Sequence, residues 1–517
     1  MALHWLDIAV LCGYLLGVLG MGFYFARRNV DTEEYFVGGR RFGGFVIGLS
    51  MVGTAISSIT FLSMPADSFK TYWLRFLPYV MVPAAALISI YFFIPFFRRR
   101  GVLTAYEYLE SRFGPSIRVY GAATYIVAQV LRTSLVLYLV ALLLHQLTDL
   151  DVGRCIWLAG AFVALYTIMG GIDAVIWTDV VQTVVLVSGS LFCLGAIVTA
   201  LPGGLEQIFS VAAEHHKFSL ASVVDGQRVP ISWGLDLGAK TVPLMLMMSL
   251  TYFMTEYATA QHFVQRYCAA RSTREARKAM LYSVLIGMPT WLFYMFLGTS
   301  LFVFFQVFPV PAAEEMLSGV QRAEGIVPLF ILTYLPPGVA GLVIAAALAA
   351  AMSSLDSSIN AVAAVGIVDV YQRHVAHDRS DRHYLRAAQL LAALASLLMV
   401  VGANLLLHAD GPTLQDISIR LTSLLGGGLL GIYLLGFLTN RGDARSIWCG
   451  IACTAAFTLW TLGVFPTRLS LPFDSYYTAA IGNLVMFGVG VGVAALLPRR
   501  ERDLTDLTVW ERSGPGA

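Results

Sequence analysis

Charged residues are scarce in this chain. Asp, Glu, Lys and Arg make up only 13% of its 517 residues, whereas 57% of the residues are hydrophobic. Soluble domains carry about 25% charged residues, so this composition excludes a water-soluble enzyme or binding module and indicates an integral membrane protein. The net charge of +2 comes from basic residues spread over short loops, which excludes a basic face for nucleic acid.

Cysteine is also rare, with six residues, and none of their spacings suits a metal site. The six are interpreted as small buried hydrophobic residues. The chain lacks a metal-ligand pair, a nucleophile motif and paired carboxylates at helical spacing, which argues against a membrane enzyme. The first apolar run, residues 4–26, has no basic region before it, so it is predicted to be a retained helix rather than a signal peptide.

Long apolar runs are abundant. A run of about 18 residues or more can cross a bilayer as a helix. The sequence therefore predicts an all-α integral membrane protein with about thirteen spans, surrounded by the lipid bilayer. The spans are predicted at residues 4–26, 43–66, 74–97, 116–149, 152–170, 173–200, 232–264, 276–308, 337–370, 384–408, 414–438, 445–465 and 475–497.

Basic residues gather in alternate loops between these spans. Arg98–Arg100 lie in one such loop, and Arg266 is counted with the basic residues that follow the span 232–264. The positive-inside rule assigns the basic loops to the cytoplasm. We therefore predict a multi-pass protein of the cell (inner) membrane, with the N-terminus outside and the C-terminus in the cytoplasm.

Two of the predicted spans are poor helices. The span 43–66 contains small and polar residues from Gly53 to Thr60, and the span 232–264 is expected to be interrupted at Lys240, Thr241 and Pro243. The two spans are five apart and cross the membrane in opposite directions. Interrupted helices in two antiparallel halves are typical of an inverted-repeat transporter with its site at the midplane, although Pro and Gly also kink ordinary membrane helices.

A serine-rich cluster lies in the middle of the apolar span 337–370. Ala350, Ser353, Ser354 and Ser357 follow i, i+3, i+4, i+7 spacing and share one face of a helix. Hydroxyl and carbonyl oxygens are suitable ligands for a small hard cation. The alternative is that these small residues let two helices pack closely.

Two charged residues are predicted to lie inside the membrane. Asp179 is interpreted as a functional residue, or as a structural carboxylate bonded to Thr178 or to a neighbouring helix. Arg132 must meet a carboxylate, backbone carbonyls or an anionic ligand, because an unpaired guanidinium there is costly. Its partner is either an anionic solute or a protein carboxylate such as Asp236 or Glu256.

Five motifs in order resemble the sodium:solute symporter family. They are EYFVGGR at 34–40, YEYLESRFG at 106–114, YTIMGGIDAVIWTDVVQ at 166–182, VQRYCAARSTREARK at 264–278 and the serine-rich cluster at 349–360. Within the family, the chain looks most similar to sodium-coupled sialic acid transporters. The resemblance implies a LeuT-type fold, a five-plus-five inverted repeat with flanking helices.

The resemblance implies four regions. Residues 1–42 hold the first helix and a loop, 43–231 the first repeat, 232–440 the second repeat, and 441–517 two C-terminal helices with a short cytoplasmic tail.

The resemblance also implies a main sodium (Na+) site. The matching positions are Gly53, Ile56, Ala350, Ser353 and Ser354. Asp179 matches an aspartate on the inner sodium exit path, which helps to form a second sodium site in sialic acid transporters. Because that second site uses a serine where this chain has Ala350, the number of sodium ions stays open between one and two.

For the solute, the resemblance implies that Arg132 holds a carboxylate and that Ser57 and Thr60 line the pocket. Gln129 lies near Arg132, while Gln261 and His262 occupy the region that faces the solute in sugar transporters. A lone histidine is also often structural.

We therefore expect a sodium-driven symporter of a carboxylated sugar such as sialic acid, with no obligatory protein partner. The alternatives are symport of a neutral sugar, polyol or amino acid, and more remotely a passive channel.

Overall fold

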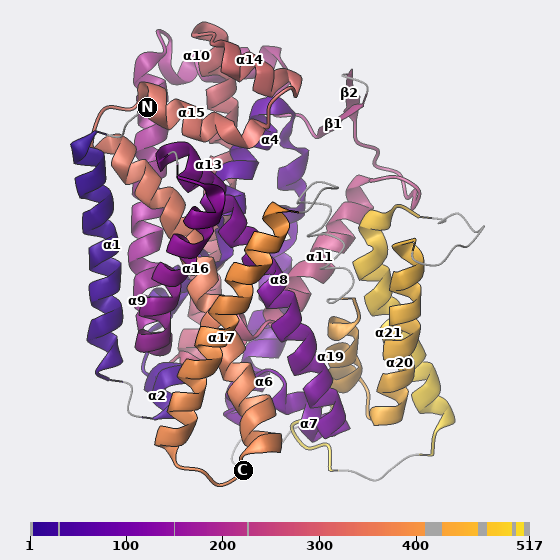
Figure 1. Cartoon of the computed structure of the whole chain (residues 1–517). Coiled ribbons are helices and arrows are strands. Elements are labelled where there is room, and N and C mark those ends of the chain that lie inside the picture. Colours follow the sequence, from indigo (N-terminus) through magenta and orange to yellow (C-terminus); the bar gives the residue numbers. More distant parts are fainter. Residues whose placement is uncertain are drawn as a thin grey trace.

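The computed structural model describes residues 4–28, 31–148, 150–224, 227–408, 427–463, 473–498 and 503–510. Within these residues the chain is almost entirely helical, with one short hairpin, β1 (Ala221–Val224) and β2 (Gln227–Pro230). The long helices run side by side, α1 begins at one end of the bundle and residues 503–510 lie at the other (Figure 1).

The helices have the following bounds: α1 (Trp5–Ala26), α2 (Thr32–Val37), α3 (Gly44–Ala55), α4 (Met64–Lys70), α5 (Val82–Ile88), α6 (Ile94–Arg100), α7 (Glu107–Phe113), α8 (Pro115–Thr148), α9 (Val152–Ala200), α10 (Gly204–Glu214), α11 (Val242–Thr259), α12 (Gln261–Ala269), α13 (Thr273–Val307), α14 (Pro311–Ser318), α15 (Ile326–Tyr334), α16 (Val339–Val365), α17 (Asp381–Leu407), α19 (Leu429–Leu438), α20 (Ala444–Thr461) and α21 (Thr478–Leu496). Short 3-10 or π-helical turns cover Gly38–Arg40, Ile59–Ser63, Trp73–Met81, Ser89–Phe93, Ala323–Gly325, Gly366–Val375 and Ser475–Tyr477.

In the described part of the chain, eight helices are long and apolar enough to cross a membrane, and nine if one bent pair counts as a span. The helix α9 covers two predicted spans, 152–170 and 173–200. They are separated at Gly171, whose φ of 61° and ψ of −160° interrupt the helix. A Cβ there would lie 2.8 Å from the Tyr35 ring, so both backbone and packing require glycine.

The count of thirteen stays a prediction. Much of the predicted span 414–438 falls in residues 409–426, which lie outside the described residues. The first described helix after them is α19. Most of the other predicted spans agree with helices to within a few residues at each end.

The first predicted break is confirmed. The chain bends by 63° between Gly44–Ala55 and Ile59–Lys70. Ile56, the C-cap residue that follows the last residue of α3, has extended backbone angles (φ −96°, ψ 100°). Small and polar residues around the bend give this segment little helix propensity of its own.

The second break was predicted at the wrong place. The helix α11 begins at Val242 with Pro243 in its first turn, where the missing N–H removes no helical hydrogen bond. Residues 232–241 are not part of the helix. The interruption lies instead at Ala260 (φ −79°, ψ 118°), between α11 and α12.

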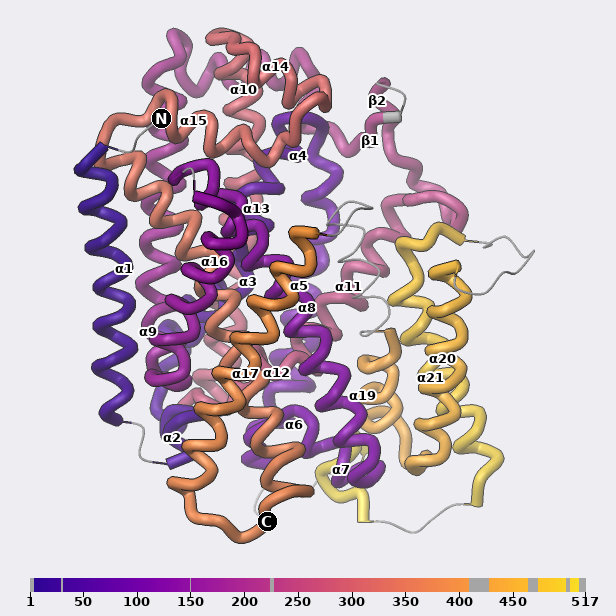
Figure 2. The backbone as a smooth tube through the Cα atoms, in the orientation of Figure 1, coloured from indigo at the N-terminus to yellow at the C-terminus, as the bar shows by residue number. Residues whose placement is uncertain are grey.

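The helix α16 runs through the inside of the bundle and packs against α9, α8, α1 and α17 (Figure 2). All but two of its 27 residues are buried. Its many alanines allow close helix approach: a Cβ added to Gly189 of α9 would lie 2.8 Å from the Ala346 Cβ. The serine-rich cluster is therefore held in the protein interior, away from lipid.

A network of ion pairs joins α7, α8 and the turn Gly366–Val375 that follows α16. Arg118 contacts Glu110 (2.6 Å) and Asp369 (2.6 Å), and Arg373 contacts Glu110 (2.6 Å). Thr104 donates a hydrogen bond to Asp369 (2.8 Å). These contacts fix the helix ends at the face of the bundle where α7 lies (Figure 1).

We expect Glu110→Gln to remove a contribution to the free energy of unfolding that depends on pH. Partial burial raises the pKa of Glu110, but the Arg118 and Arg373 guanidiniums outweigh it and hold the pKa below the ordinary value of 4.5. The stabilisation is present above about pH 4.5 and is lost as the pH falls below it. At pH 6 the variant should be less stable by about 1 kcal/mol.

Melting temperatures in detergent at pH 6 and pH 3.5 check this prediction. The difference between wild type and variant should shrink at the lower pH. Glu33→Gln is the control, because Glu33 is 59% exposed in its pair with Arg40. A Glu110→Gln difference that is the same at both pH values would contradict the assignment.

Candidate functional site

The serines of α16 meet the end of α3 at the first break. The Ser353 hydroxyl donates to the carbonyl of Gly53 (2.8 Å) and approaches the carbonyl of Ala350 (3.3 Å). The Ser354 hydroxyl donates to the carbonyl of Thr54 (3.2 Å). The last carbonyls of a helix have no partner in the helix itself, so the break exposes oxygens to which the serines can bond.

Several residues predicted for the sodium site are thus brought together from positions about 300 apart in the chain. Ser353 contacts Gly53 and Ala350, while Ser354 contacts Thr54, which was not predicted for the site. Ile56 follows as the cap of α3. Gly53 is required by packing, because a Cβ there would lie 2.8 Å from the Thr183 hydroxyl. Carbonyl and hydroxyl oxygens in a buried cluster have the chemistry of a site for a hard cation.

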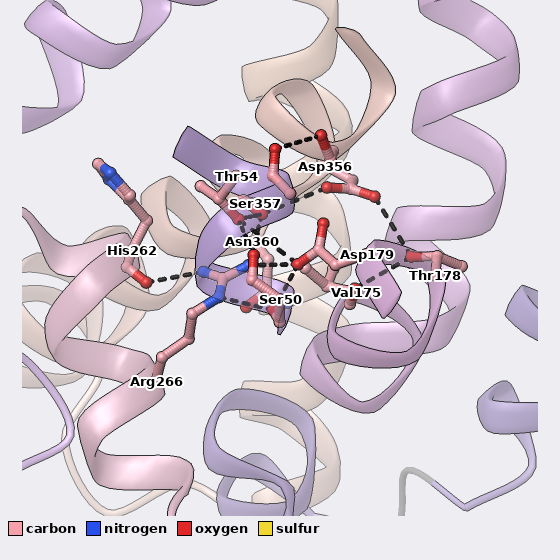
Figure 3. Close-up of polar contacts among 12 residues, drawn as sticks. Ser50, Thr54, Val175, Thr178, Asp179, His262, Arg266, Asp356, Ser357 and Asn360 are labelled. Atoms are coloured by element: carbon pink, nitrogen blue, oxygen red, sulfur yellow. Dashed lines mark hydrogen bonds and ion pairs between the residues drawn. The ribbon is translucent and has the colours of Figure 1, made fainter. Parts of the chain in front are cut away.

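Next to this cluster lies a buried ion pair (Figure 3). Arg266 of α12 donates to Asp179 (2.6 Å), Ser50 (2.8 Å) and Ser357 (2.7 Å), and its third nitrogen bonds the carbonyl of His262 (2.7 Å). Asp179 is fully buried and Arg266 is 1% exposed. One guanidinium therefore joins α3, α9, α12 and α16 at a single point.

The sequence predicts Arg266 in a loop, and this prediction is wrong. Arg266 comes directly after an apolar run and before a cluster of basic residues, where a topology rule treats it as a cytoplasmic charge. The interrupted helix carries it inside instead. Its helical spacing of i+4 from His262 is the signal that could have indicated a shared environment.

Asp179 and Asp356 have different partners. Asp179 also accepts from Ser50 (2.5 Å), and its second oxygen has no hydrogen-bond partner among the described residues. Thr178, an expected partner of Asp179, lies instead 3.4 Å from Asp356. Asp356 accepts mainly from Tyr166 (2.8 Å). Of these two buried carboxylates, only Asp179 pairs with Arg266 among the described residues.

The second break holds most of the residues predicted for the solute. Arg132 of α8 lies 3.8 Å from Glu256 of α11, so the expected protein carboxylate is Glu256 rather than the exposed Asp236. His262 lies 3.5 Å from Glu256 and 3.2 Å from the Gln129 amide. One cluster, centred on Glu256, thus contains Arg132, Gln129 and His262. The sequence predicts Glu256 only as a possible partner of Arg132.

Gln261 does not join this cluster. Its side-chain oxygen accepts from the amide of Ala105 (2.8 Å) and its side-chain nitrogen donates to the carbonyl of Leu103 (2.8 Å). Tyr106 donates to the carbonyl of Thr259 (2.9 Å) on the other side of the break. Gln261 therefore ties the loop before α7 to the second break, and its side chain is fully buried in this conformation.

Ser57 and Thr60 lie at the first break, as predicted. Ser57 is 7% exposed and Thr60 is 5% exposed. They follow directly after the carbonyls that meet Ser353 and Ser354, so these two predicted solute residues and the oxygen cluster share one short segment of chain.

The structure combines membrane-length helices, two broken segments, an oxygen cluster at one break and a charged cluster at the other. This combination defines an ion-coupled membrane transporter. The model of the sodium:solute symporter family matches residues 35–446. The chain belongs to this family, and its coupling ion is sodium.

Curated relatives and a solved structure agree. The sodium/sialic acid symporter NanT of Aliivibrio fischeri is 30% identical, with 94% of this chain and 92% of the relative covered. The sodium/sialic acid symporter SiaT of Proteus mirabilis is 30% identical, with 98% and 99% covered. The solved structure of a sodium-coupled sialic acid symporter in a substrate-bound, outward-open state matches with a TM-score of 0.86, 29% identity and 96% and 99% coverage. The predicted fold class is thereby confirmed.

Proposed function

We propose that this chain imports sialic acid, or a closely similar carboxylated sugar, together with sodium by alternating access. The observation that carries the proposal is the contact between the serine hydroxyls of α16 and the carbonyls at the end of α3. The two sialic acid symporters that match almost the full chain support the choice of solute. Sodium bound at the break would favour the conformation that binds solute, and solute would favour sodium equally.

We assign the main sodium site to Gly53, Ile56, Ala350, Ser353 and Ser354. Asp179 would lie on the exit path or in a second site, since it packs against Gly53 and one of its oxygens has no hydrogen-bond partner among the described residues, while Arg266 holds the other. For the solute, we assign Arg132, Gln129, His262, Ser57 and Thr60. Gln261 would reach the solute only after the loop before α7 has moved.

The proposed orientation has the N-terminus outside and the C-terminus in the cytoplasm of a bacterial-type inner membrane. The distribution of basic residues supports it. The first and last described residues lie at opposite ends of the bundle. Residues 43–231 and 232–440 remain our proposed bounds for the two inverted repeats. The family consists of transporters, which supports transport rather than enzymatic catalysis.

Uptake into proteoliposomes tests the proposed function. The purified protein should accumulate labelled sialic acid above the outside concentration only when sodium is higher outside. A panel of neutral sugars, polyols and amino acids is measured alongside. Uptake that does not depend on sodium, or that never exceeds equilibrium as in a channel, would overturn symport. Uptake of a neutral solute alone would overturn the choice of solute.

Arg132→Gln is expected to raise the KM for sialic acid about 10- to 100-fold, because a charge-assisted hydrogen bond to a carboxylate contributes about 1.5–3 kcal/mol. The sodium dependence should change much less. Initial rates over a range of solute concentrations give both values.

Two further variants control this result. Arg154→Gln changes an exposed arginine at the start of α9 and should leave KM unchanged. The double variant Arg132→Gln, Glu256→Gln removes both charges, and so separates loss of solute contact from the cost of an unpaired Glu256. An unchanged KM in Arg132→Gln would remove Arg132 from the solute site.

A further inference from the structure

The charged cluster at the second break contains a carboxylate that the proposed function does not explain. Glu256 is the one acidic residue within 4.0 Å of Arg132 in the described part of the chain. A second carboxylate beside an arginine that must hold an anionic solute would repel that solute. The role of Glu256 therefore rests on the proposed function and refines it.

The Arg132–Glu256 pair is loose. Its nitrogen–oxygen distance of 3.8 Å is well beyond the roughly 2.7–2.9 Å of a charge-assisted hydrogen bond. The side chains are 35% and 20% exposed, with Arg132 in the middle of α8 and Glu256 in the last turn of α11, next to the second break. Arg132 thus keeps donors for a ligand carboxylate, and Glu256 keeps acceptor capacity toward the same space.

His262 holds Glu256 from the other side, and its tautomer follows from its neighbours. The His262 Nδ1 faces the Tyr125 hydroxyl (3.1 Å) and the Gln129 side-chain nitrogen (3.2 Å). The Tyr125 oxygen already accepts from the His262 backbone N–H (3.2 Å), so its hydrogen is free to point at Nδ1. With two donors at Nδ1, the ring hydrogen lies on Nε2 and is directed at Glu256, 3.5 Å away.

Gln129 in turn contacts α16. The Ser358 hydroxyl donates to the carbonyl of Ser354 (2.8 Å) and lies 3.2 Å from the Gln129 side-chain oxygen, while the Gln129 side-chain nitrogen faces His262. His262 is 2% exposed and Gln129 is 5% exposed. Glu256 is therefore anchored by a buried row of polar side chains that begins one helical turn after Ser354.

We propose that Glu256 is a specificity residue that accepts a hydrogen bond from the solute whose carboxylate Arg132 holds. The Arg132 guanidinium and the Glu256 carboxylate lie side by side. They fit a solute that carries its own carboxylate and, on the adjacent carbon, a hydroxyl or ammonium donor. Sialic acid belongs to this class through its 2-hydroxyl. A carboxylate without the donor would meet the negative charge of Glu256 with nothing to offset it.

Competition against labelled sialic acid uptake in proteoliposomes tests this assignment. Wild-type protein should be inhibited at least tenfold more strongly by unlabelled sialic acid than by its 2-deoxy analogue, which lacks the donor. In Glu256→Gln the ratio should fall to about threefold or less, because the amide carries no charge to repel the analogue. Glu256→Asp keeps the charge, so it should keep the discrimination while binding both solutes more weakly.

Glu33→Gln, an exposed glutamate far from the site, should leave the ratio unchanged. Equal inhibition by the two solutes in the wild type, or an unchanged ratio in an active Glu256→Gln, would overturn the role of Glu256 alone. Absence of sodium-driven sialic acid uptake in the wild type would overturn the proposed function, and this inference with it.

Discussion

Arg266→Ala should be less stable than the wild type by about 3–5 kcal/mol and should not transport. Removing one partner of a buried ion pair leaves an uncompensated charge in the protein interior. Arg266 is 1% exposed and bonds groups on four helices, so Asp179, Ser50 and Ser357 would all lose a partner at once. The expected result is a large drop in melting temperature in detergent, together with loss of sodium-driven uptake.

Two controls separate this effect from a general loss of arginine. Arg271→Ala removes a 64% exposed side chain that makes a 3.9 Å surface pair with Glu275, and should cost about 1 kcal/mol or less. The double variant Arg266→Gln, Asp179→Asn removes both charges and should recover part of the stability. An Arg266→Ala protein as stable as Arg271→Ala would contradict the importance of the buried pair.

Ser353→Ala should raise the sodium concentration for half-maximal uptake about 5- to 30-fold. The variant removes one oxygen from the proposed sodium shell and leaves the carbonyl of Gly53 without its 2.8 Å donor. A loss of about 1–2 kcal/mol accounts for this change in apparent affinity. Uptake of labelled sialic acid at a series of sodium concentrations, with total ionic strength held constant, measures it.

Ser396→Ala is the matched control for Ser353→Ala. Ser396 is also a buried helical serine, but its hydroxyl bonds only the carbonyl of Ala392 in its own helix (2.8 Å) among the described residues. It should leave the sodium dependence as in the wild type. An unchanged half-saturating sodium concentration in an active Ser353→Ala protein would remove Ser353 from the proposed site.

The first break and the serine cluster could be predicted because their residues conflict with their surroundings. Small and polar side chains from Gly53 to Thr60 interrupt an apolar run, and Ser353 and Ser354 share one helix face. Membrane helices make such departures visible, since lipid offers polar groups no hydrogen bonds. Local sequence therefore indicated both halves of the oxygen cluster, although only the tertiary fold brings them into contact.

The second break could not be placed in the same way. Ala260 is neither proline nor glycine, and nothing in its local sequence competes with a helix. Tertiary contacts stabilise the interruption instead: the loop before α7 bonds the carbonyl of Thr259 and the side chain of Gln261. The second break was predicted near Pro243 because proline disrupts helix interiors. Pro243 instead lies in the first turn of α11, where proline is tolerated.

The buried network around Arg266 also has an electrical consequence. Asp179 is the carboxylate that pairs with Arg266 in the described part of the chain, so with Asp179 ionised this buried pair carries no net charge. A sodium ion bound beside Gly53, which packs directly against Asp179, would add one positive charge to this region. A unit charge that crosses the membrane field gains or loses about 2.3 kcal/mol per 100 mV. Membrane voltage would therefore act mainly on the conformational change of the sodium-loaded protein, and much less on the return of the empty one.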